Sequence, residues 1–342
     1  MPYKITLLLL LSFYAGFAQD INTKQPIENL VFEGAGIRGI AYSGVIKQLE
    51  QHNMMKDIKK VGGTSAGAIT SLMLALGYTS DEIYTIISET KFQKFNDGRF
   101  VFFGGFSRLG SRYGWYKGDA FTHWLEKIIK DKTGNAYITF KELNEQGYKQ
   151  LYVTATCLNR QKLLVLSAET YPNMKIKDAV RISMSVPLYF EAVFIDSDGK
   201  LYKKQKKGKN LDVVVDGGIT GNFPIFIFDS VYNDSSNRKI RVPNYKTIGV
   251  RIDTEAQIES DAVNKELVPA EIDNLMGYLQ AFYIMALENL NRNQLTDEDW
   301  QRTISVSSVG IGPKVKTLSK EQKLSLIQSG EKYTANFLSK VK

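Results

Sequence analysis

The chain has 342 residues, of which 43% are hydrophobic and 23% are charged, and its formal net charge is +8. This ordinary globular composition can fill a core, in one large domain or two modest ones. Cys157 is the only cysteine, which excludes a fold held by intrachain disulfides. The basic balance indicates attraction to anionic membrane surfaces or acidic polymers, although a solvated basic surface is the commoner meaning of such a balance.

The first residues are typical of a secretory signal peptide. Lys4 precedes the apolar run Ile5–Phe13, and small residues at Gly16 and Ala18 lie three positions and one position before an expected cleavage after Ala18. The run is too short for a spanning helix, and the alternative is a membrane anchor or a buried N-terminal helix. The sequence therefore predicts export, with the mature protein periplasmic, outer-membrane-associated or secreted.

A glycine loop follows the first expected strand, Asn29–Glu33. Residues Gly34–Gly39 have the sequence G-A-G-I-R-G, and apolar residues at helical spacing come next. This pattern can bind a dinucleotide, but that fold needs a second strand ending in an acidic residue about 20 positions later. Residues 52–60 form a polar, basic connection instead, which disfavours nucleotide binding. Such a loop can also point backbone N–H groups at the oxyanion of an acyl-transfer intermediate.

A serine lies in a second glycine-rich turn, Gly63-Thr64-Ser65-Ala66-Gly67. The spacing G-x-S-x-G places the serine on a sharp turn between a buried strand and a helix, with its hydroxyl directed into a cleft. The free N–H groups at the start of that helix are available to an anion. Taken alone, the pentapeptide is as compatible with an ordinary glycine-softened turn as with an attacking serine.

The histidines do not fit the role of base for Ser65. The chain has only His52 and His123, and an α/β-hydrolase needs a histidine that follows both the serine and the acid. A chymotrypsin-like order could use His52, but those barrels lack the strand, glycine loop and helix found here. Both histidines are more simply surface or core residues.

Asp216 is the best-placed alternative base. It closes the apolar strand Val213–Val215 and is followed by Gly217 and Gly218, which allow a sharp turn. A strand-terminal aspartate can reach a neighbouring strand-terminal serine at the carboxyl edge of a sheet, where α/β folds place their sites. Because aspartate is weakly basic, it needs a desolvated environment to serve. By itself, Asp-Gly-Gly is also consistent with a simple turn.

The rest of the chain predicts further helices and strands, with two unusual segments. Residues 92–116 combine nine aromatic residues with five glycines, a poor helix that either forms a mobile flap at an acyl groove or membrane interface, or packs its rings on the core. Lys203–Lys209 contains five lysines and favours a solvated hairpin tip over a specific headgroup contact. Strands are expected at Leu151–Leu158 with an antiparallel partner Leu163–Ser167, and at Phe190–Ile195, Leu211–Val215, Tyr245–Ile252 and Thr303–Ile311. Helices are expected at Ala68–Gly77, Asp81–Thr90 with Ser80 as its cap, Gly118–Ile129, Lys177–Met184, Ala270–Asn293 and Ser319–Val341.

Together the three motifs resemble the patatin-like phospholipase family. Gly34–Gly39, Gly63–Gly67 and Asp216–Gly218 occur in the family's order and spacing. Ala179–Pro187 and Gly221-Asn222-Phe223-Pro224 also fit, so the resemblance covers about residues 28–229. We therefore expect one domain over residues 19–342, in which strands and helices from residues 245–342 pack on the motif-bearing core.

The resemblance implies a three-layer α/β/α sandwich with a mostly parallel central sheet. It also implies a Ser65–Asp216 dyad without histidine, and hydrolysis of lipid acyl esters without a metal or cofactor. The expected oxyanion donors are the N–H groups of Gly34, Ala35, Gly36 and Ala66, and the expected supporting residues are Arg38, Gly39, Gly63, Gly67, Gly217 and Gly218.

Two features depart from the family's pattern. Ala35 stands where many members carry glycine, and it cannot readily adopt positive φ, which puts the loop geometry in question. The lysine-rich stretch Lys203–Lys209 lengthens the hairpin before Asp216. Arg38 either sets the loop or attracts a phosphate.

The sequence therefore predicts an exported bacterial serine acyl hydrolase that acts on a lipid ester or phospholipid. Peripheral contact with an anionic membrane surface is expected, and a nucleic-acid partner is not. Two alternatives remain at this stage: a weakly active or noncatalytic lipid- or membrane-binding protein on the same scaffold, and a peptidase. Nothing in the sequence indicates the oligomeric state.

Overall fold

The structure is a computed structural model. It describes residues 26–98, 101–269, 272–275, 278, 281, 285, 288, 291–312 and 317–340. The expected signal peptide, residues 1–18, and much of the expected helix Ala270–Asn293 lie outside the described residues. Within the described residues, no helix combines the length and apolar character needed to cross a bilayer.

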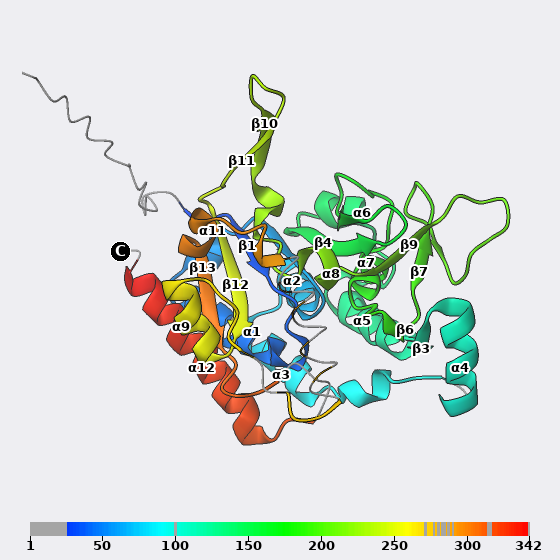
Figure 1. The fold of residues 1–342 in the computed structure, drawn as a ribbon, viewed down its shortest axis with the longest axis horizontal. Coiled ribbons are helices and arrows are strands. Elements are labelled where there is room, and N and C mark those ends of the chain that lie inside the picture. Colours follow the sequence, from blue (N-terminus) through cyan, green and yellow to red (C-terminus); the bar gives the residue numbers. More distant parts are fainter. Residues whose placement is uncertain are drawn as a thin grey trace, which may run out of the picture.

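The protein is built on one nine-stranded mixed sheet (Figure 1). Its strand order is β13-β12-β1-β2-β4-β9-β7-β8, with β5 paired to β4. The parallel strands are β1 (Asn29–Phe32), β2 (Lys60–Gly63), β4 (Gln150–Cys157), β12 (Thr247–Asp253) and β13 (Thr303–Ser307). Two strands pair antiparallel with β4, namely β5 (Lys162–Leu166) and β9 (Asp212–Asp216). Next, β7 (Val193–Ile195) pairs antiparallel with β9, and β8 (Leu201–Tyr202) pairs antiparallel with β7. The C-terminal strands β12 and β13 thus extend the sheet that the motif-bearing part begins.

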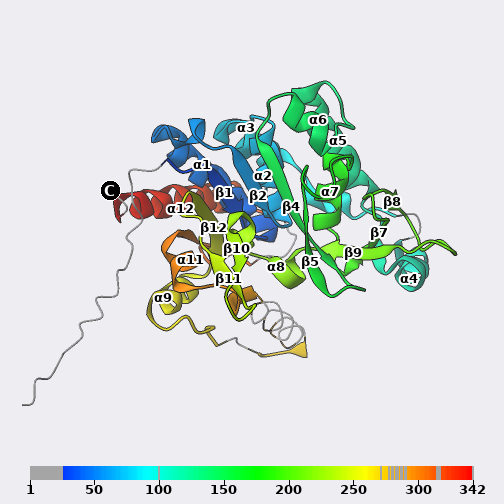
Figure 2. The same cartoon turned by 90° about the horizontal axis from the view of Figure 1, so that it is seen from above.

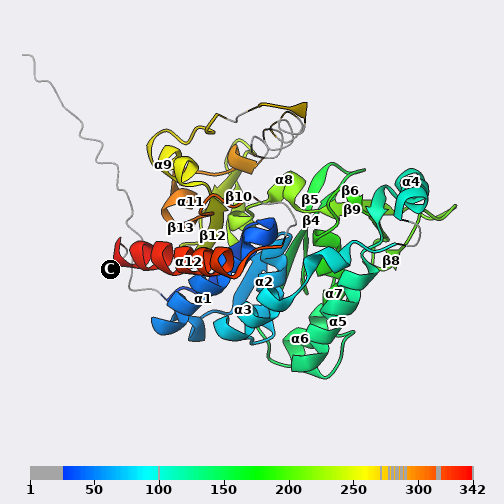
Figure 3. The same ribbon diagram turned by 90° about the horizontal axis from the view of Figure 1, so that it is seen from below.

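Helices cover both faces of the sheet, which gives the three expected layers (Figures 2 and 3). On one side lie α1 (Ala41–Gln51), α2 (Ala66–Ala75), α7 (Ile176–Ser183) and α12 (Lys320–Lys340), and on the other α8 (Gly218–Gly221), α9 (Glu255–Val263) and α11 (Asp297–Gln301). The other elements are η1 (Gly36–Ile40), η2 (Met54–Lys56), α3 (Ser80–Glu89), η3 (Phe92–Phe95), α4 (Val101–Arg112), β3 (Gly114–Tyr116), α5 (Asp119–Thr133), α6 (Phe140–Glu145), β6 (Leu188–Phe190), η4 (Ile225–Phe228), β10 (Ser230–Asn233) and β11 (Lys239–Val242).

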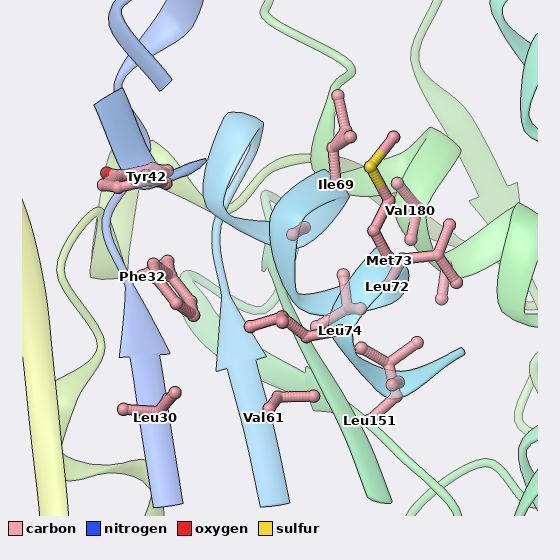
Figure 4. Close-up of a cluster of buried hydrophobic side chains, with 14 of the residues drawn as sticks. Leu30, Phe32, Tyr42, Val61, Ile69, Leu72, Met73, Leu74, Leu151 and Val180 are labelled. Carbon is pink, nitrogen blue, oxygen red and sulfur yellow. The ribbon is translucent and has the colours of Figure 1, made fainter. Parts of the chain in front are cut away.

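The core lies between the parallel strands and α2. Leu30, Val61 and Leu151 project from three adjacent strands toward apolar side chains of α2, such as Leu72 (Figure 4). The helix α2 is almost completely buried along its length, as its uniformly apolar sequence predicts. The turn that precedes α2 is therefore anchored to the buried core.

The expectation that residues 92–116 make a poor helix was wrong for α4. Residues 101–112 form a helix despite Gly104, Gly105 and Gly110. A Cβ on Gly105 would lie 2.5 Å from the ring of Trp115, so the absent side chain allows the helix to pack directly on that ring. This packing offsets the low helix propensity of glycine, about 1 kcal/mol per residue relative to alanine.

Several expected elements have different boundaries in the structure. The expected strand Phe190–Ile195 is divided between β6 and β7, and the last strand ends at Ser307 rather than at Ile311. The cap of α3 is Thr79, not Ser80, because the Thr79 side chain and Glu82 form a reciprocal capping box. The hairpin of β10 and β11 had no predicted counterpart.

The C-terminal helix α12 crosses α1 at two glycines. A Cβ on Gly44 would lie 2.1 Å from the carbonyl oxygen of Ile327, and a Cβ on Gly330 would lie 2.2 Å from that of Ala41. The two backbones therefore touch where side chains would otherwise hold them apart. Because α1 directly follows the glycine loop, this crossing supports the helix to which that loop is attached.

Gly330→Ala is expected to destabilise the fold, because the added methyl group forces α1 and α12 apart. We expect the free energy of unfolding to fall by about 1–3 kcal/mol, measured by urea denaturation followed by circular dichroism. Gly110→Ala in α4 is the matched control, since nothing lies within 4 Å of its added Cβ, and it should leave stability unchanged or raised. Equal losses in the two variants would contradict the proposed role of the crossing.

Candidate active site

Ser65 lies at the turn between β2 and α2. β2 ends at Gly63, α2 begins at Ala66, and the Ser65 backbone has φ 53° and ψ −119°. This conformation is strained for a residue that carries a Cβ, and it is the one expected of a serine on a strand-to-helix elbow. Ser65 is half-buried, and the positive end of the α2 dipole adjoins it.

The motif glycines lie where backbones approach too closely for a side chain. A Cβ on Gly63 would lie 2.6 Å from the carbonyl carbon of Gly67, and a Cβ on Gly67 would lie 2.2 Å from the carbonyl oxygen of Phe32. A Cβ on Gly217 would lie 2.7 Å from the Thr154 carbonyl oxygen, whereas one on Gly39 would meet the Ala66 side chain at 3.0 Å. These glycines shape the site and contribute no side-chain chemistry.

β9 brings Asp216 level with Ser65. Gly63 at the end of β2 pairs with Val153 of β4, and Ala155, two residues further along β4, pairs with Asp216. Since Ser65 follows Gly63 by two residues, Ser65 and Asp216 lie at the same level along the direction of β4, one on each side of that strand. The structure therefore brings together the two residues that the sequence singled out.

The sequence argument for this proximity was wrong in one respect. β2 and β9 are not neighbours, because β4 lies between them, and β9 runs antiparallel to β4. β9 therefore approaches the carboxyl edge of the parallel strands from the opposite direction. It reaches the site because β4 continues past the end of β2, so that a strand returning along β4 stops level with the turn at Ser65.

The Asp216 carboxyl is enclosed, with 5% of the residue exposed. Burial raises its pKa to about 7, while hydrogen bonds from the Gly218 N–H and the Ser65 hydroxyl lower it. The Gly218 nitrogen lies 2.6 Å from Asp216 Oδ1. A carboxylate with a pKa near neutrality is a better proton acceptor than an exposed aspartate, whose pKa is about 3.9.

The segment that ends α7 contacts both residues. Ser183 Oγ accepts a hydrogen bond from the Ser65 N–H at 2.9 Å, and the Ser185 carbonyl accepts one from the Asp216 N–H at 2.9 Å. Between them, Met184 Sδ lies 3.3 Å from Ser65 Oγ. Three consecutive residues thus hold the backbones of Ser65 and Asp216 in register and cover the serine hydroxyl.

The glycine loop and the start of α2 carry N–H groups that have no acceptor among the described residues. Among the described residues, the N–H groups of Ala35, Gly36 and Ala66 have no acceptor, whereas the Gly34 N–H donates to the Asn222 carbonyl at 3.0 Å. Gly34 is close to the serine, since a Cβ on it would lie 3.4 Å from Ser65 Cβ. Its N–H, however, already donates a hydrogen bond to Asn222 and is not available to another acceptor.

The alanine in the loop adopts an ordinary backbone conformation. Ala35 has φ −125°, and the positive φ in the loop, 55°, belongs to Gly36. The replacement of glycine by Ala35 therefore introduces no backbone strain. The concern that its Cβ would distort the loop does not apply.

Arg38 contacts its own loop. Its side-chain Nε donates a hydrogen bond to the Ala35 carbonyl at 3.1 Å, and its backbone N–H donates one to the same oxygen at 3.3 Å. Because the carbonyl and the following N–H of a trans peptide point in opposite directions, this contact turns the Gly36 N–H away from Arg38. Of the two roles expected for Arg38, the structure contains the contact that sets the loop.

Glu33 and Asn222 complete the support of the loop, and neither was predicted as a site residue. Asn222 Nδ2 donates to Glu33 Oε1 at 3.3 Å and to the Gly34 carbonyl at 3.1 Å. Burial raises the pKa of Glu33 to about 7, while the Arg251 guanidinium, 3.9 Å away, opposes the rise. The only signal in the sequence was the fit of Gly221–Pro224 to the family pattern, which marked Asn222 without giving its role.

The other candidate groups lie elsewhere. His52 and His123 are exposed, and neither hydrogen-bonds to Ser65 or Asp216 in the described part of the chain. The described residues contain no cluster of three His, Cys, Asp or Glu side chains suited to a metal ion. A cavity of about 300 Å³ between α1, α3 and α12 is separate from the site, and its lining includes Lys47, Tyr84 and Glu331.

The sequence from residue 30 to residue 229 matches the family model described as Patatin-like phospholipase. The chain belongs to the patatin-like phospholipase family. The matched part contains all three motifs, and the Ser65 turn, the glycine loop and Asp216 meet at one place within it.

Relatives of this patatin-like chain are found in viruses and in a bacterium. It is 26% identical over 213 residues to a protein of Invertebrate iridescent virus 6 named "Probable lipid hydrolase", covering 62% of this chain and 67% of that protein. It is 28% identical over 286 residues to an uncharacterized protein of Acanthamoeba polyphaga mimivirus, covering 83% and 84%. A third relative, an uncharacterized protein of Bacillus subtilis, is 33% identical over 208 residues, covering 58% of this chain and 65% of the relative.

A solved structure supports the patatin-like fold. VipD from Legionella pneumophila superposes with a TM-score of 0.54 at 16% identity, covering 92% of this chain and 67% of that chain. At this identity the likeness concerns the fold alone.

Asp216 is expected to destabilise the folded protein at neutral pH. The pKa of Asp216 is about 7 in the folded protein and about 3.9 in the unfolded chain. The protonated carboxyl therefore favours the folded state, and this contribution is fully present below about pH 4 and is lost as the pH rises through 7. Asp216→Asn removes this titration. We therefore expect the Tm of the variant, followed by circular dichroism, to exceed that of the wild type by a margin that grows from pH 5 to pH 8.

Asp212→Asn is the control for this experiment. Asp212 is also buried, but it accepts a hydrogen bond from Arg160 Nε at 2.8 Å. Removal of its charge breaks that ion pair and should lower the Tm. A Tm difference for Asp216→Asn that did not change with pH would show that the Asp216 carboxyl is not desolvated in the way described.

Proposed function

We propose that this protein is a serine acyl hydrolase of the phospholipase A type, which cleaves lipid esters through a Ser65–Asp216 dyad. The observation that carries the proposal is the position of the Ser65 hydroxyl beside a buried carboxyl whose pKa is raised to about 7. Membership in the patatin-like phospholipase family and similarity to a viral protein named "Probable lipid hydrolase" support a lipid ester or phospholipid as substrate.

In the first step, Ser65 Oγ attacks the ester carbonyl carbon while Asp216 accepts the hydroxyl proton. The negative charge that develops on the carbonyl oxygen is stabilised by N–H groups of Ala35, Gly36 and Ala66, which are unpaired in the described structure. We leave Gly34 out of this set because its N–H is bonded to Asn222. Collapse of the intermediate expels the alcohol, which takes the proton from Asp216, and leaves an acyl-enzyme on Ser65.

In the second step, water hydrolyses the acyl-enzyme. Asp216 accepts a proton from the water, the same N–H groups hold the oxyanion, and Ser65 leaves with its proton restored. No step requires a metal or a cofactor. Met184, which contacts Ser65 Oγ at 3.3 Å, must give way when the ester carbonyl approaches the serine.

We further propose that the protein is exported and works at a lipid surface. The apolar run Ile5–Phe13 with a cleavage site after Ala18 supports export. The net charge of +8, from which cleavage after Ala18 removes only Lys4, supports contact with anionic membranes.

Ser65→Ala and Asp216→Asn are each expected to abolish hydrolysis, because neither member of the dyad acts without the other. We expect kcat/KM for nitrophenyl esters, phospholipids and triglycerides to fall by at least about 10³ in each variant. A fluorophosphonate probe should label the wild type and not Ser65→Ala. A well-folded wild type that is not labelled would overturn the proposal and favour a noncatalytic lipid-binding protein.

The rate is expected to depend on the ionisation of Asp216. Because the base must be deprotonated to accept a proton, kcat/KM for a soluble short-chain ester should rise with pH through about 7 and level off above it. Glu33 has a similar pKa, so the profile is measured again in Glu33→Gln. An inflection that persists in this variant belongs to Asp216, whereas one that disappears belongs to Glu33 and contradicts the assignment.

A further inference from the structure

The unit formed by α4, β3 and β6 carries three exposed apolar side chains. Phe106 is 57% exposed, Tyr113 49% and Leu188 67%. Phe106 contacts the Trp115 ring at 5.0 Å, and Gly114, which follows Tyr113, pairs with Leu188. We call Phe106, Tyr113 and Leu188 the apolar rim.

Leu188 is held exposed at an energetic cost. Its φ is 66°, a left-handed conformation that is unfavourable for a residue with a side chain. A strained backbone that presents an apolar side chain to water gains nothing for the fold, and such outliers gather at functional positions.

The apolar rim is attached to the active site. Met184, whose Sδ contacts Ser65 Oγ at 3.3 Å, precedes Leu188 by four residues in the same connection. Arg112 at the end of α4 pairs with Glu191 just after β6, with Nη1 3.2 Å from Oε2. The rim is thus fixed to the segment that covers the nucleophile.

A lysine-rich loop lies next to the rim. Residues 203–210, here called the lysine loop, are all exposed, and they join β8 to β9. Between residues 199 and 211 there are six lysines and no acidic residue. Among the lysines of the loop, only Lys203 has an acidic partner in the described structure, Asp119 at 3.2 Å.

The rim and the lysine loop belong to the same end of the molecule. Tyr113 contacts the ring of Phe194 in β7 at 6.0 Å, and β7 pairs with β8, which leads into the loop. Figures 2 and 3 show α4 beside β8 and the hairpin that extends from it, at the end opposite to α12.

We propose that the apolar rim and the lysine loop together form a docking surface for an anionic lipid bilayer. Aromatic and leucine side chains are favoured in the interfacial region of a bilayer, and lysines are attracted to anionic headgroups. The charge of the loop selects the anionic surface as the occupant. The proposal rests on the proposed function, since the purpose of docking is to bring lipid esters close to Met184 and Ser65.

Vesicle flotation of the full chain tests the proposal. Ser65→Ala is the background, so that binding is measured without hydrolysis and any contribution of the N-terminal residues is the same in every variant. We expect binding to vesicles of phosphatidylcholine mixed with phosphatidylglycerol to exceed binding to phosphatidylcholine alone and to weaken with salt. Lys204→Gln with Lys207→Gln should lower the partition coefficient by about fivefold per lysine.

The apolar rim is tested in the same assay. Phe106→Ser and Leu188→Ser should each lower binding severalfold at both low and high salt, because apolar contacts are not screened by ions. Thermal unfolding checks that each variant remains folded. Binding that is unchanged in the rim variants and in the lysine variants would overturn the docking surface.

Matched controls lie on α12, at the other end of the molecule. Leu324 is 52% exposed, and Lys320 and Lys332 are also exposed. Leu324→Ser, and Lys320→Gln with Lys332→Gln, should leave vesicle binding unchanged. An equal loss in these controls, or binding to soluble heparin without binding to vesicles, would contradict a lipid surface as the partner.

Hydrolysis of a soluble short-chain ester separates this proposal from the proposed function. If the docking surface alone is wrong, protein with Ser65 intact cleaves the soluble ester, and its rim and loop variants attack vesicles as fast as the wild type. If only the proposed function is wrong, the soluble ester is not cleaved, while the expected order of vesicle binding among the variants remains.

Discussion

The antiparallel pairing of β9 with β4 is the constraint on which the site depends. β9 ends beside Ala155 of β4, and the Ser185 carbonyl accepts a hydrogen bond from the Asp216 N–H. The same arrangement that delivers Asp216 to Ser65 therefore also removes it from water, and this burial is the cause of its raised pKa.

The glycine loop Gly34–Gly39 is held by contacts that leave the N–H groups of Ala35 and Gly36 without an acceptor among the described residues. Arg38 donates a hydrogen bond to the Ala35 carbonyl, and the Asn222 side chain donates one to the Gly34 carbonyl. The Asn222 backbone carbonyl accepts a hydrogen bond from the Gly34 N–H. The loop is thus fixed through its carbonyl groups. N–H donors that are already held in position need no reorganisation when negative charge develops on a substrate oxygen. This is the property expected of an oxyanion site.

The sequence revealed the parts of the site that have local causes. Ser65 could be found because a strand-to-helix elbow needs glycines at fixed spacing, and Asp216 because a glycine pair ends its strand. Met184, Glu33 and Asn222 could not be assigned roles, because their contacts join segments far apart in the chain. The helix α4 was missed for a similar reason, since Gly105 is compatible with a helix only because Trp115 packs against it.

The crossing of α12 over α1 has a consequence for the order in which the protein matures. Lys47 and Glu331, which bond beside this crossing, are 284 positions apart, and closure of so long a loop is a late event in folding. The glycine loop and α1 therefore gain this support only after α12 has packed on α1. Under the proposed activity, catalytic competence depends on that late closure.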